Sequence, residues 1–262
     1  MDRLSEPSIA TPSQGRPAAE AAEAAEAVMA TAAPPVLAMQ AARHRWPDRA
    51  AAELMLPAIA LPAGRSLLLR GPSGSGKSTL LSLAAGVRVG APGQVRVAGQ
   101  DWAALPAAHR DAWRGEVIGY IFQQFNLLPW LDLIDNVLLP CRFSARRRAA
   151  CGASGPRREA ERLLDALGLP RDAWRRPAAT LSVGQQQRVA AARALIGAPA
   201  LVLADEPTSA LDEPRTAAFM ALLQAECRAA GSALLMVSHD SRLAPHFDAT
   251  LSLDAPAGAE HD

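Results

Sequence analysis

A glycine-rich segment with one lysine is the part of the chain best suited to bind phosphate. Residues 71–79 read Gly71-Pro72-Ser73-Gly74-Ser75-Gly76-Lys77-Ser78-Thr79 and match the pattern G-x-x-x-x-G-K-[ST]. Glycines let backbone N–H groups approach phosphate oxygens, because no Cβ stands in the way. Lys77 can contact the β- and γ-phosphates of a nucleotide, and the Ser78 hydroxyl can bind Mg²⁺. The segment predicts a site at which a nucleoside triphosphate is bound and hydrolysed.

Lys77 is also the only lysine in the chain. All other side chains of the Lys and Arg class are arginines. An arginine carries a wide planar guanidinium, whereas a lysine carries a compact ammonium. A loop that wraps around one phosphate therefore has a physical reason to keep a lysine at this position.

Two adjacent carboxylates, Asp205 and Glu206, follow the apolar run Leu201–Ala204. At the end of a buried strand, Asp205 can bind Mg²⁺, and Glu206 can direct a water molecule toward the γ-phosphate. Acidic residues also end many strands without any catalytic role. The phosphate-binding loop earlier in the chain favours the catalytic interpretation over this alternative.

A third candidate element is the segment Leu181-Ser182-Val183-Gly184-Gln185, which predicts a helix start. Ser182 is a good N-cap, and Gly184 keeps the backbone open. The N–H groups at a helix N-terminus favour an anion. A plain capped helix is the alternative, but the position of the segment about twenty residues before the acidic pair favours a role in the same site.

The phosphate-binding loop needs a strand before it and a helix after it. Residues 65–70 (RSLLLR) predict the strand, and the helix is expected to begin at Lys77 and to continue to about Ala85. The alternative is an ordinary Gly/Ser-rich turn, which would not require a strand before it and a helix after it. The loop is therefore expected to join a strand to a helix.

The rest of the chain alternates short apolar runs with helical patterns. The runs at 201–204 and 233–237 are typical of parallel strands buried on both faces. Helices are expected over 158–167, which Gly168 would end, and from Ser182 to Ile196. This alternation predicts an α/β fold whose ligands lie where the strands end.

Composition limits the classes of function. A formal charge of +1 over 262 residues leaves no broad basic field, so no nucleic acid is expected as a partner. Half of the residues are hydrophobic, enough for one sizeable core. No apolar run approaches the roughly 20 residues that cross a bilayer. Glu20, Glu23 and Glu26 interrupt the N-terminal alanines, so no signal peptide is expected.

Residues 1–33 are expected to form a disordered Ala/Glu/Pro-rich tail, because they hold few large apolar side chains. Met29 and Met39 leave a later start of translation open. The three cysteines lie far apart in the sequence without C-x-x-C spacing, and reduced thiols are expected at Cys141, Cys151 and Cys227.

From about Pro35 to Leu253 the chain resembles the nucleotide-binding subunit of an ATP-binding cassette (ABC) transporter. The family signature LSGGQ matches residues 181–185, except that Val183 replaces the first glycine. The other landmarks follow in the family's order: Gln123 in YIFQ, SALD at 209–212 and SHD at 238–240. The stretches IGYIFQQFNLLPWLDLIDNVLLP and LSVGQQQRVA narrow the resemblance to the lipoprotein-release and macrolide-export type.

The resemblance implies a P-loop NTPase fold. In this family an ABC ATPase core with a RecA-like sheet is joined by an antiparallel β subdomain and an α-helical signature subdomain. The ATP-binding domain is accordingly expected over residues 34–257, with the helical subdomain at about 125–190.

The resemblance also implies that two copies of the chain enclose ATP and Mg²⁺. Residues 71–79 of one copy would face Ser182, Gly184 and Gln185 of the other. The remaining implied roles are polarisation of the attacking water by Glu206, contact of His239 with the γ-phosphate, binding of Mg²⁺ by Ser78, Asp205 and Gln123, and stacking of Trp46 on adenine. For Trp46, a partly buried surface tryptophan is the alternative.

The partners that the resemblance implies are an integral membrane permease and a second ATPase subunit, at the cytoplasmic face of the inner membrane. One alternative is an ATP-driven regulator of a membrane-bound envelope enzyme that moves no solute. Another is a cassette ATPase that acts on nucleic acid or ribosomes, which the near-neutral charge disfavours.

Two surface features have alternative interpretations. The hydrophobic residues Leu127, Leu128, Pro129 and Trp130 are expected to receive a permease helix rather than to pack inside the helical subdomain. For an arginine-rich segment, a solvated loop is favoured over contact with acidic lipids or a permease; its arginines are Arg142, Arg146, Arg147, Arg148, Arg157 and Arg158.

Overall fold

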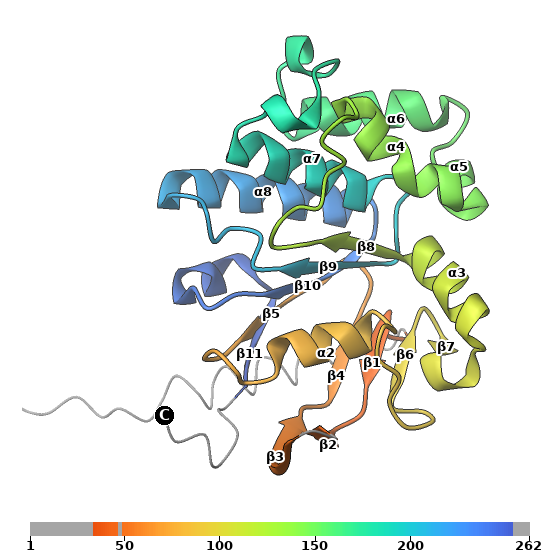
Figure 1. The fold of residues 1–262 in the computed structure, drawn as a ribbon, viewed down its shortest axis with the longest axis vertical. Coiled ribbons are helices and arrows are strands. Elements are labelled where there is room, and N and C mark those ends of the chain that lie inside the picture. Colours follow the sequence, from red (N-terminus) through yellow and green to blue (C-terminus); the bar gives the residue numbers. More distant parts are fainter. Residues whose placement is uncertain (1–33, 47–48, 254–262) are drawn as a thin grey trace, which may run out of the picture.

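The computed structural model describes residues 34–46 and 49–253 and has the expected α/β architecture. A parallel sheet of five strands in the order β11-β5-β10-β9-β8 crosses its middle (Figure 1). The five strands are β5 (Ser66–Arg70), β8 (Ile118–Ile121), β9 (Leu201–Asp205), β10 (Ala233–Val237) and β11 (Ala249–Ser252). The expected strands at 65–70, 201–204 and 233–237 are therefore present, two of them with limits shifted by one residue.

A separate antiparallel sheet lies on the side of the molecule where α2 is found, and its strand order is β4-β1-β6-β7 (Figure 1). Its strands are β1 (Leu37–Met39), β4 (Ile59–Leu61), β6 (Val95–Val97) and β7 (Gln100–Asp101). A hairpin of β2 (Ala42–Trp46) and β3 (Arg49–Leu56) connects β1 to β4. The antiparallel β subdomain that the sequence predicted is thus confirmed.

The helices form two groups around the parallel sheet. Helices α2 (Lys77–Ala84) and α3 (Ala107–Val117) lie toward the antiparallel strands, while α4 (Leu133–Phe143), α5 (Ala145–Ala150), α6 (Gly155–Ala166) and α7 (Val183–Leu195) gather at the opposite end (Figure 1). Helix α8 (Glu213–Ala229) lies between this second group and the sheet. Short 3₁₀ turns are η1 (Trp102–Ala104), η2 (Arg171–Ala173), η3 (Ala178–Thr180) and η4 (Ser241–His246).

The parallel sheet has an apolar core on each face. Along β9, Val202 and Ala204 belong to the core shared with the helices α4 to α8, whereas Leu201 and Leu203 belong to the core shared with α2 and the antiparallel sheet. All four side chains are fully buried. The continuous apolar runs are explained by burial on both faces, as expected for central parallel strands.

The arginine-rich segment is not a loop, which corrects the expectation of a solvated loop. Its residues belong to α4, α5 and α6. Arg147 is 2% exposed and donates from Nη2 to the carbonyl oxygen of Ala194 at 2.5 Å, so it joins α5 to the end of α7. The other five arginines are exposed.

The cysteines are free thiols in the structure, as expected. Two of them are nevertheless neighbours in space, because α4 and α5 pack together: the Sγ atoms of Cys141 and Cys151 are 3.8 Å apart. Burial raises the pKa of both thiols, that of Cys151 to about 12. Separation along the sequence was therefore a poor guide to their position.

Helix limits differ slightly from those expected. Helix α6 begins at Gly155 instead of residue 158, because Pro156 suits the first turn of a helix. Gly168 follows its end with a φ of +69°, a conformation that glycine adopts without strain. The predicted tail at 1–33 and the predicted domain limit at 257 lie outside the described residues.

Candidate nucleotide-binding site

The candidate residues meet at one edge of the parallel sheet. The strand registers place Val237 of β10 beside Leu69 of β5 on one side and Asp205 of β9 on the other. Ala204 of β9 in turn pairs with Ile121 of β8. Four consecutive strands therefore end side by side, and the segments that follow them are residues 71–76, 238–239, 205–206 and 122–123. Parallel α/β sheets bind ligands at this edge.

The phosphate-binding loop has a backbone that requires glycine. Gly74 and Gly76 have φ values of +80° and +92°. A Cβ on Gly71 would lie 2.5 Å from Ser75 Oγ and 2.6 Å from the carbonyl oxygen of Leu253. Gly76 is the N-cap of α2 and provides no side chain to cap it. The first N–H groups of α2 are thus left to bind an anion.

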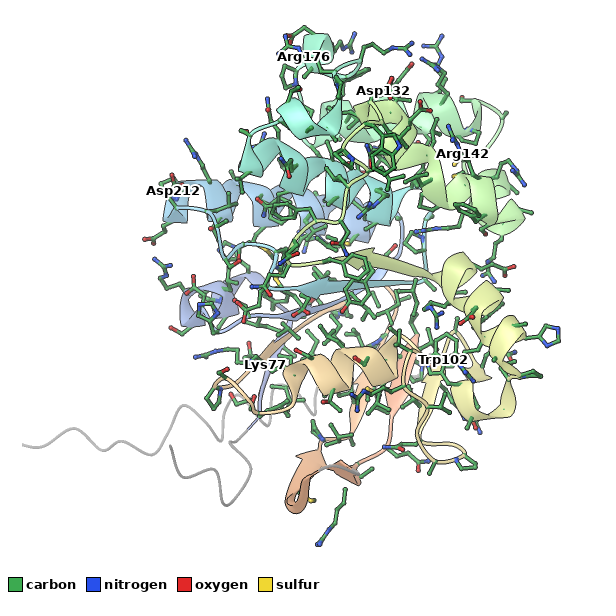
Figure 2. All side chains as sticks on the ribbon, in the orientation of Figure 1. Lys77, Trp102, Asp132, Arg142, Arg176 and Asp212 are labelled. Carbon is green, nitrogen blue, oxygen red and sulfur yellow. The ribbon has the colours of Figure 1, made fainter. Side chains whose placement is uncertain are left out.

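Lys77 lies across this loop, at the start of α2 (Figure 2). Its Nζ donates to the carbonyl oxygens of Gly71 and Pro72, at 2.7 Å each, and the residue is 9% exposed. An ammonium has three protons, so these two bonds leave one donor. The backbone of the loop thus fixes the position of the Lys77 ammonium.

The phosphate-binding loop has hydrogen-bond donors that are free to bind phosphate oxygens. Ser75 is fully buried, and its Oγ has no hydrogen-bond partner among the residues that the structure describes. A buried hydroxyl without a partner is costly in a folded protein. Together with the uncapped helix and the remaining Lys77 donor, it gives the loop donors for several phosphate oxygens. Of the other loop positions, Pro72, Ser73, Gly74 and Ser78 are exposed, and Thr79 is half-buried.

Two side chains from neighbouring strands make direct contact at this edge. The Oε2 atom of Glu206 lies 2.5 Å from Nδ1 of His239. Glu206 has a φ of +44°, which is strained for a residue other than glycine, and its N–H donates to the carbonyl oxygen of Val237. Since strained backbone is kept where surrounding structure fixes it, the site holds the Glu206 carboxylate in a defined place.

Asp205 is half-buried at the end of β9. Burial raises the pKa of its carboxyl, the charge of Glu206 raises it further, and the charge of Lys77 lowers it. Asp205 therefore belongs to the same electrostatic site as Lys77 and Glu206. A carboxylate beside a second carboxylate is stabilised by a bound cation, which is the chemistry expected of a Mg²⁺ ligand.

Gln123 is exposed, two residues beyond the end of β8. Before it, the rings of Tyr120 and Phe122 stack with their centroids 4.2 Å apart. Burial, with a smaller contribution from Asp205, raises the pKa of the Tyr120 hydroxyl. Gln123 thus follows β8, the strand next to β9, at the edge where Asp205 lies.

The segment 181–185 has the local structure that the sequence predicted. Ser182 caps α7: the N–H of Gln185 donates to Ser182 Oγ, and the Gln185 side chain accepts from the N–H of Ser182. Ser182 and Val183 are exposed, and Gly184 is half-buried. Within the described part of the chain, no hydrogen bond joins this segment to residues 71–79.

Trp46 ends β2, but its side chain lies outside the described residues, and its contact with adenine stays a prediction. Sequence reasoning also missed two polar residues, Asn136 and Arg193, which hold the segment after Gln123. No sequence pattern identifies them, because their partners are backbone atoms, which any residue type provides, and those of Arg193 are also distant in the sequence.

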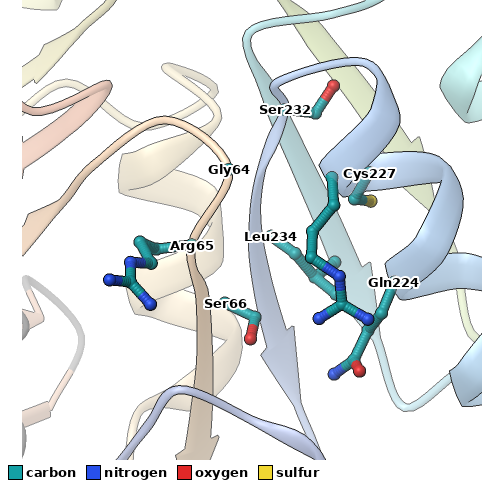
Figure 3. A pocket seen from close by; sticks show the side chains of 8 residues that line it. Gly64, Arg65, Ser66, Gln224, Cys227, Ser232 and Leu234 are labelled. Atoms are coloured by element: carbon teal, nitrogen blue, oxygen red, sulfur yellow. The ribbon is translucent and has the colours of Figure 1, made fainter.

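A shallow hollow elsewhere on the molecule is not part of this site. Figure 3 shows it between Arg65 and Ser66 at the start of β5 and Gln224 and Cys227 on α8. The strands begin there, whereas the phosphate-binding loop follows their other ends. The position of the hollow therefore separates it from the nucleotide site.

Comparison with known proteins agrees with this geometry. A family model described as "ABC transporter" matches residues 57–209. The lipoprotein-releasing system ATP-binding protein LolD of Anaeromyxobacter dehalogenans is 46% identical over 200 residues, which cover 74% of this chain and 80% of that protein. The uncharacterized ABC transporter ATP-binding protein YbbA of Escherichia coli is 39% identical over 195 residues, covering 74% and 83%.

Solved structures give the same fold. One is described as the dimeric structure of MJ0796, a bacterial ABC transporter cassette; it has a TM-score of 0.70 and 30% identity, and 84% of this chain covers 94% of that one. A second shows a dimeric post-hydrolysis state of the same cassette bound to ADP and Pi, with a TM-score of 0.69, 31% identity and coverage of 83% and 94%.

Proposed function

Because the chain belongs to the ABC transporter family, we propose that it is the subunit that powers a separate membrane permease by ATP-dependent closure of a dimer. The chain is an ATPase with an ABC cassette fold. The observation that carries the proposal is the common edge at which residues 71–79, the Glu206–His239 pair and Gln123 lie. That edge combines phosphate binding with a carboxylate held ready to act on water.

The residues of this edge have separate tasks in hydrolysis. The N–H groups of residues 71–79 and the Lys77 ammonium bind and orient the phosphates, which accounts for much of the rate in phosphoryl transfer. Ser78, Asp205 and Gln123 would hold Mg²⁺, whose charge balances that of the phosphates and the carboxylates. Glu206 accepts a hydrogen bond from the attacking water and increases the negative character of its oxygen.

His239 fixes the carboxylate of Glu206. With Nδ1 donating to Glu206, Nε2 remains for the γ-phosphate. The side chain of His239 is 67% exposed, whereas that of Glu206 is 17% exposed. His239 thus lies on the solvent side of the pair, where a closing partner would cover it and exclude water.

A second copy of the chain would complete the site with the start of its helix α7. Ser182 and Val183 at the start of α7 are exposed, and among the described residues no hydrogen bond joins them to the phosphate-binding loop of their own chain. In a head-to-tail pair this helix start would bind the γ-phosphate held by the other copy. Hydrolysis then depends on pairing, because each chain carries two different halves of a site.

The permease would contact an apolar surface next to Gln123, formed by the exposed side chains of Phe122 and Trp130 and by half-buried Leu128. Phe122 is 39% exposed and Trp130 is 71% exposed, high values for large apolar side chains. No helix in the described ranges is long and apolar enough to cross a membrane. We place the chain at the cytoplasmic face of the inner membrane, and the names of its relatives favour an exporter of the lipoprotein-release type.

The test is reconstitution with the permease encoded beside the chain. The permease is expected to stimulate ATP hydrolysis by the wild-type chain. Trp130→Ala should weaken binding of the permease and remove the stimulation. Phe143→Ala is the matched control, because Phe143 is 87% exposed on α4, away from Gln123, and its loss should leave stimulation intact.

The outcome separates transport from the alternative of a regulator. Stimulation together with movement of a substrate across the membrane supports a transporter. Stimulation that changes only the activity of an envelope enzyme supports a regulator. A permease that neither binds the chain nor alters its hydrolysis would contradict the proposal.

A further inference from the structure

The segment after Gln123 is bound by an arginine from the helix that carries residues 182–185. Arg193 of α7 donates from Nη1 to the carbonyl oxygen of Asn126, at 2.6 Å, and from Nη2 to that of Phe125, at 2.5 Å. The two acceptors are consecutive in the sequence. A planar guanidinium can bridge two such oxygens, whereas a point charge on a flexible stem holds them less precisely.

The turn that presents these two carbonyls is strained. Phe125 and Asn126 have φ values of +59° and +48°, in the left-handed region. This region is unfavourable for a bulky residue such as Phe125, because its Cβ lies too close to the following carbonyl oxygen. Such a turn persists only when other contacts fix it. Phe125 is 8% exposed, so its ring fixes one side of the turn, and Arg193 binds the carbonyl oxygens on the other.

The segment is fixed again a few residues later by Asn136 of α4, which is fully buried. Its Oδ1 accepts from the N–H of Leu128 at 2.8 Å, and its Nδ2 donates to the carbonyl oxygen of Leu128 at 3.0 Å. Between the end of β8 and the start of α4, the chain is thus held at two places by side chains of the helical group.

The backbone of α7 next to Arg193 is held against β8. A Cβ on Gly119 of β8 would lie 2.1 Å from the carbonyl oxygen of Ala194, so the last turn of α7 touches the strand directly. The same oxygen accepts from buried Arg147 at 2.5 Å. The backbone next to Arg193 therefore cannot shift freely. Because the guanidinium of Arg193 binds the turn after Gln123, that turn is held in place as well.

We propose that Arg193 is a positioning residue that keeps Gln123 in place for hydrolysis and links it to the helix bearing Ser182. Ten residues of one continuous helix separate Val183 from Arg193, a span of about 15 Å. Two hydrogen bonds from Arg193 therefore join this helix to the segment that follows Gln123. The inference rests on the proposed role of Gln123 in the site.

A matched control lies on the same helix. Arg188 is also half-buried, and its Nη1 donates to a backbone carbonyl oxygen, that of Gly168, at 3.2 Å. Gly168 belongs to the loop after α6, which does not lead to Gln123. Replacing Arg188 removes a similar contact of α7 without releasing the turn at Phe125 and Asn126.

The experiment compares Arg193→Gln with Arg188→Gln in the full chain. Arg193→Gln is expected to lower kcat for basal ATP hydrolysis by about tenfold, as loss of a residue that orients a site residue often does. Its affinity for ATP in the absence of Mg²⁺ should not change, because residues 71–79 do not contact Arg193. Arg188→Gln should match the wild type in kcat. Equal loss in both variants, or no loss in kcat for Arg193→Gln, would overturn the proposal.

A double-mutant cycle shows whether Arg193 acts through Gln123. Gln123→Ala should lower kcat, and adding Arg193→Gln to it should cause no further loss, because coupled residues are not additive. The proposal would be contradicted if the losses in kcat of the two variants were additive. It would also be contradicted if Arg193→Gln lowered kcat while Gln123→Ala did not. Both assays omit the permease, so failure of the transport function leaves their outcome unaffected.

A conservative variant tests the proposal even if Arg193→Gln folds poorly. Arg193→Lys keeps the positive charge but loses the planar fork, and its kcat should lie between those of the wild type and Arg193→Gln. Hydrogen exchange gives a direct reading of the turn: the amides of residues 124–126 should exchange faster in Arg193→Lys than in Arg188→Gln. Equal exchange in the two variants would show that Arg193 does not hold the turn.

Discussion

Glu206 and His239 follow neighbouring parallel strands, and their side chains meet at 2.5 Å between Oε2 and Nδ1. The register of β9 and β10 produces this contact, since Asp205 pairs with Val237 and each of the two side chains comes shortly after its strand ends. The pair is therefore fixed by the sheet rather than by flexible loops, and each partner can be tested separately.

His239→Ala should slow ATP hydrolysis by about 10²-fold, in the range for loss of one hydrogen-bond donor that stabilises charge in the transition state. Nucleotide affinity should change little, because Lys77 and the helix start remain. His109→Ala serves as the control, since His109 is exposed on α3, far along the chain from this edge. The rates are measured at saturating ATP; equal rates for His239→Ala and the wild type would remove His239 from the site.

Lys77 offers a test based on its being the only lysine. An amine-directed reagent can modify only this side chain and the chain N-terminus, and the two are separated by peptide mapping. ATP should protect Lys77 from modification and leave the N-terminus unprotected. Lys77→Ala should lose most of the nucleotide affinity. Modification at the same rate with and without ATP would contradict binding at this loop.

Gly119→Ala should destabilise the fold, because the added Cβ meets backbone atoms of Ala194 that cannot rotate away. Overpacking of this kind costs about 1–3 kcal/mol. Gly115→Ala, in α3 where nothing lies within 4 Å of the Cβ, should be neutral or stabilising by about 0.5–1 kcal/mol. Urea unfolding of both variants measures the difference. Equal stabilities would mean that α7 and β8 separate easily.

The parts of the site that follow from local pattern were predicted well from the sequence. The strand, loop and helix around Lys77, the apolar runs of β9 and β10, and the cap at Ser182 all depend on residues near one another in the chain. Parallel strand order then brings Asp205 and Glu206 to the same edge as the loop, because α/β sheets end their strands there.

Features that depend on contacts between distant segments were not predicted. The arginine-rich segment was expected to be a loop, yet Arg147 is buried against α7 because the helix end offers a carbonyl oxygen. Cys141 and Cys151 meet only because α4 and α5 pack together. The bonds from Arg193 to Phe125 and Asn126 join residues more than sixty positions apart, and no local pattern announces them.

In the proposed dimer, residues 71–79 of one chain and the start of α7 of the other enclose each ATP. Glu206→Gln keeps the shape of the side chain but removes the carboxylate that acts on water, so it should bind ATP without turnover. Sedimentation with and without ATP and Mg²⁺ measures the result. A single chain of 27.5 kDa is expected without nucleotide, and a particle of twice that mass is expected with it. Unchanged hydrolysis, or ATP bound to a particle that stays single, would contradict the proposal.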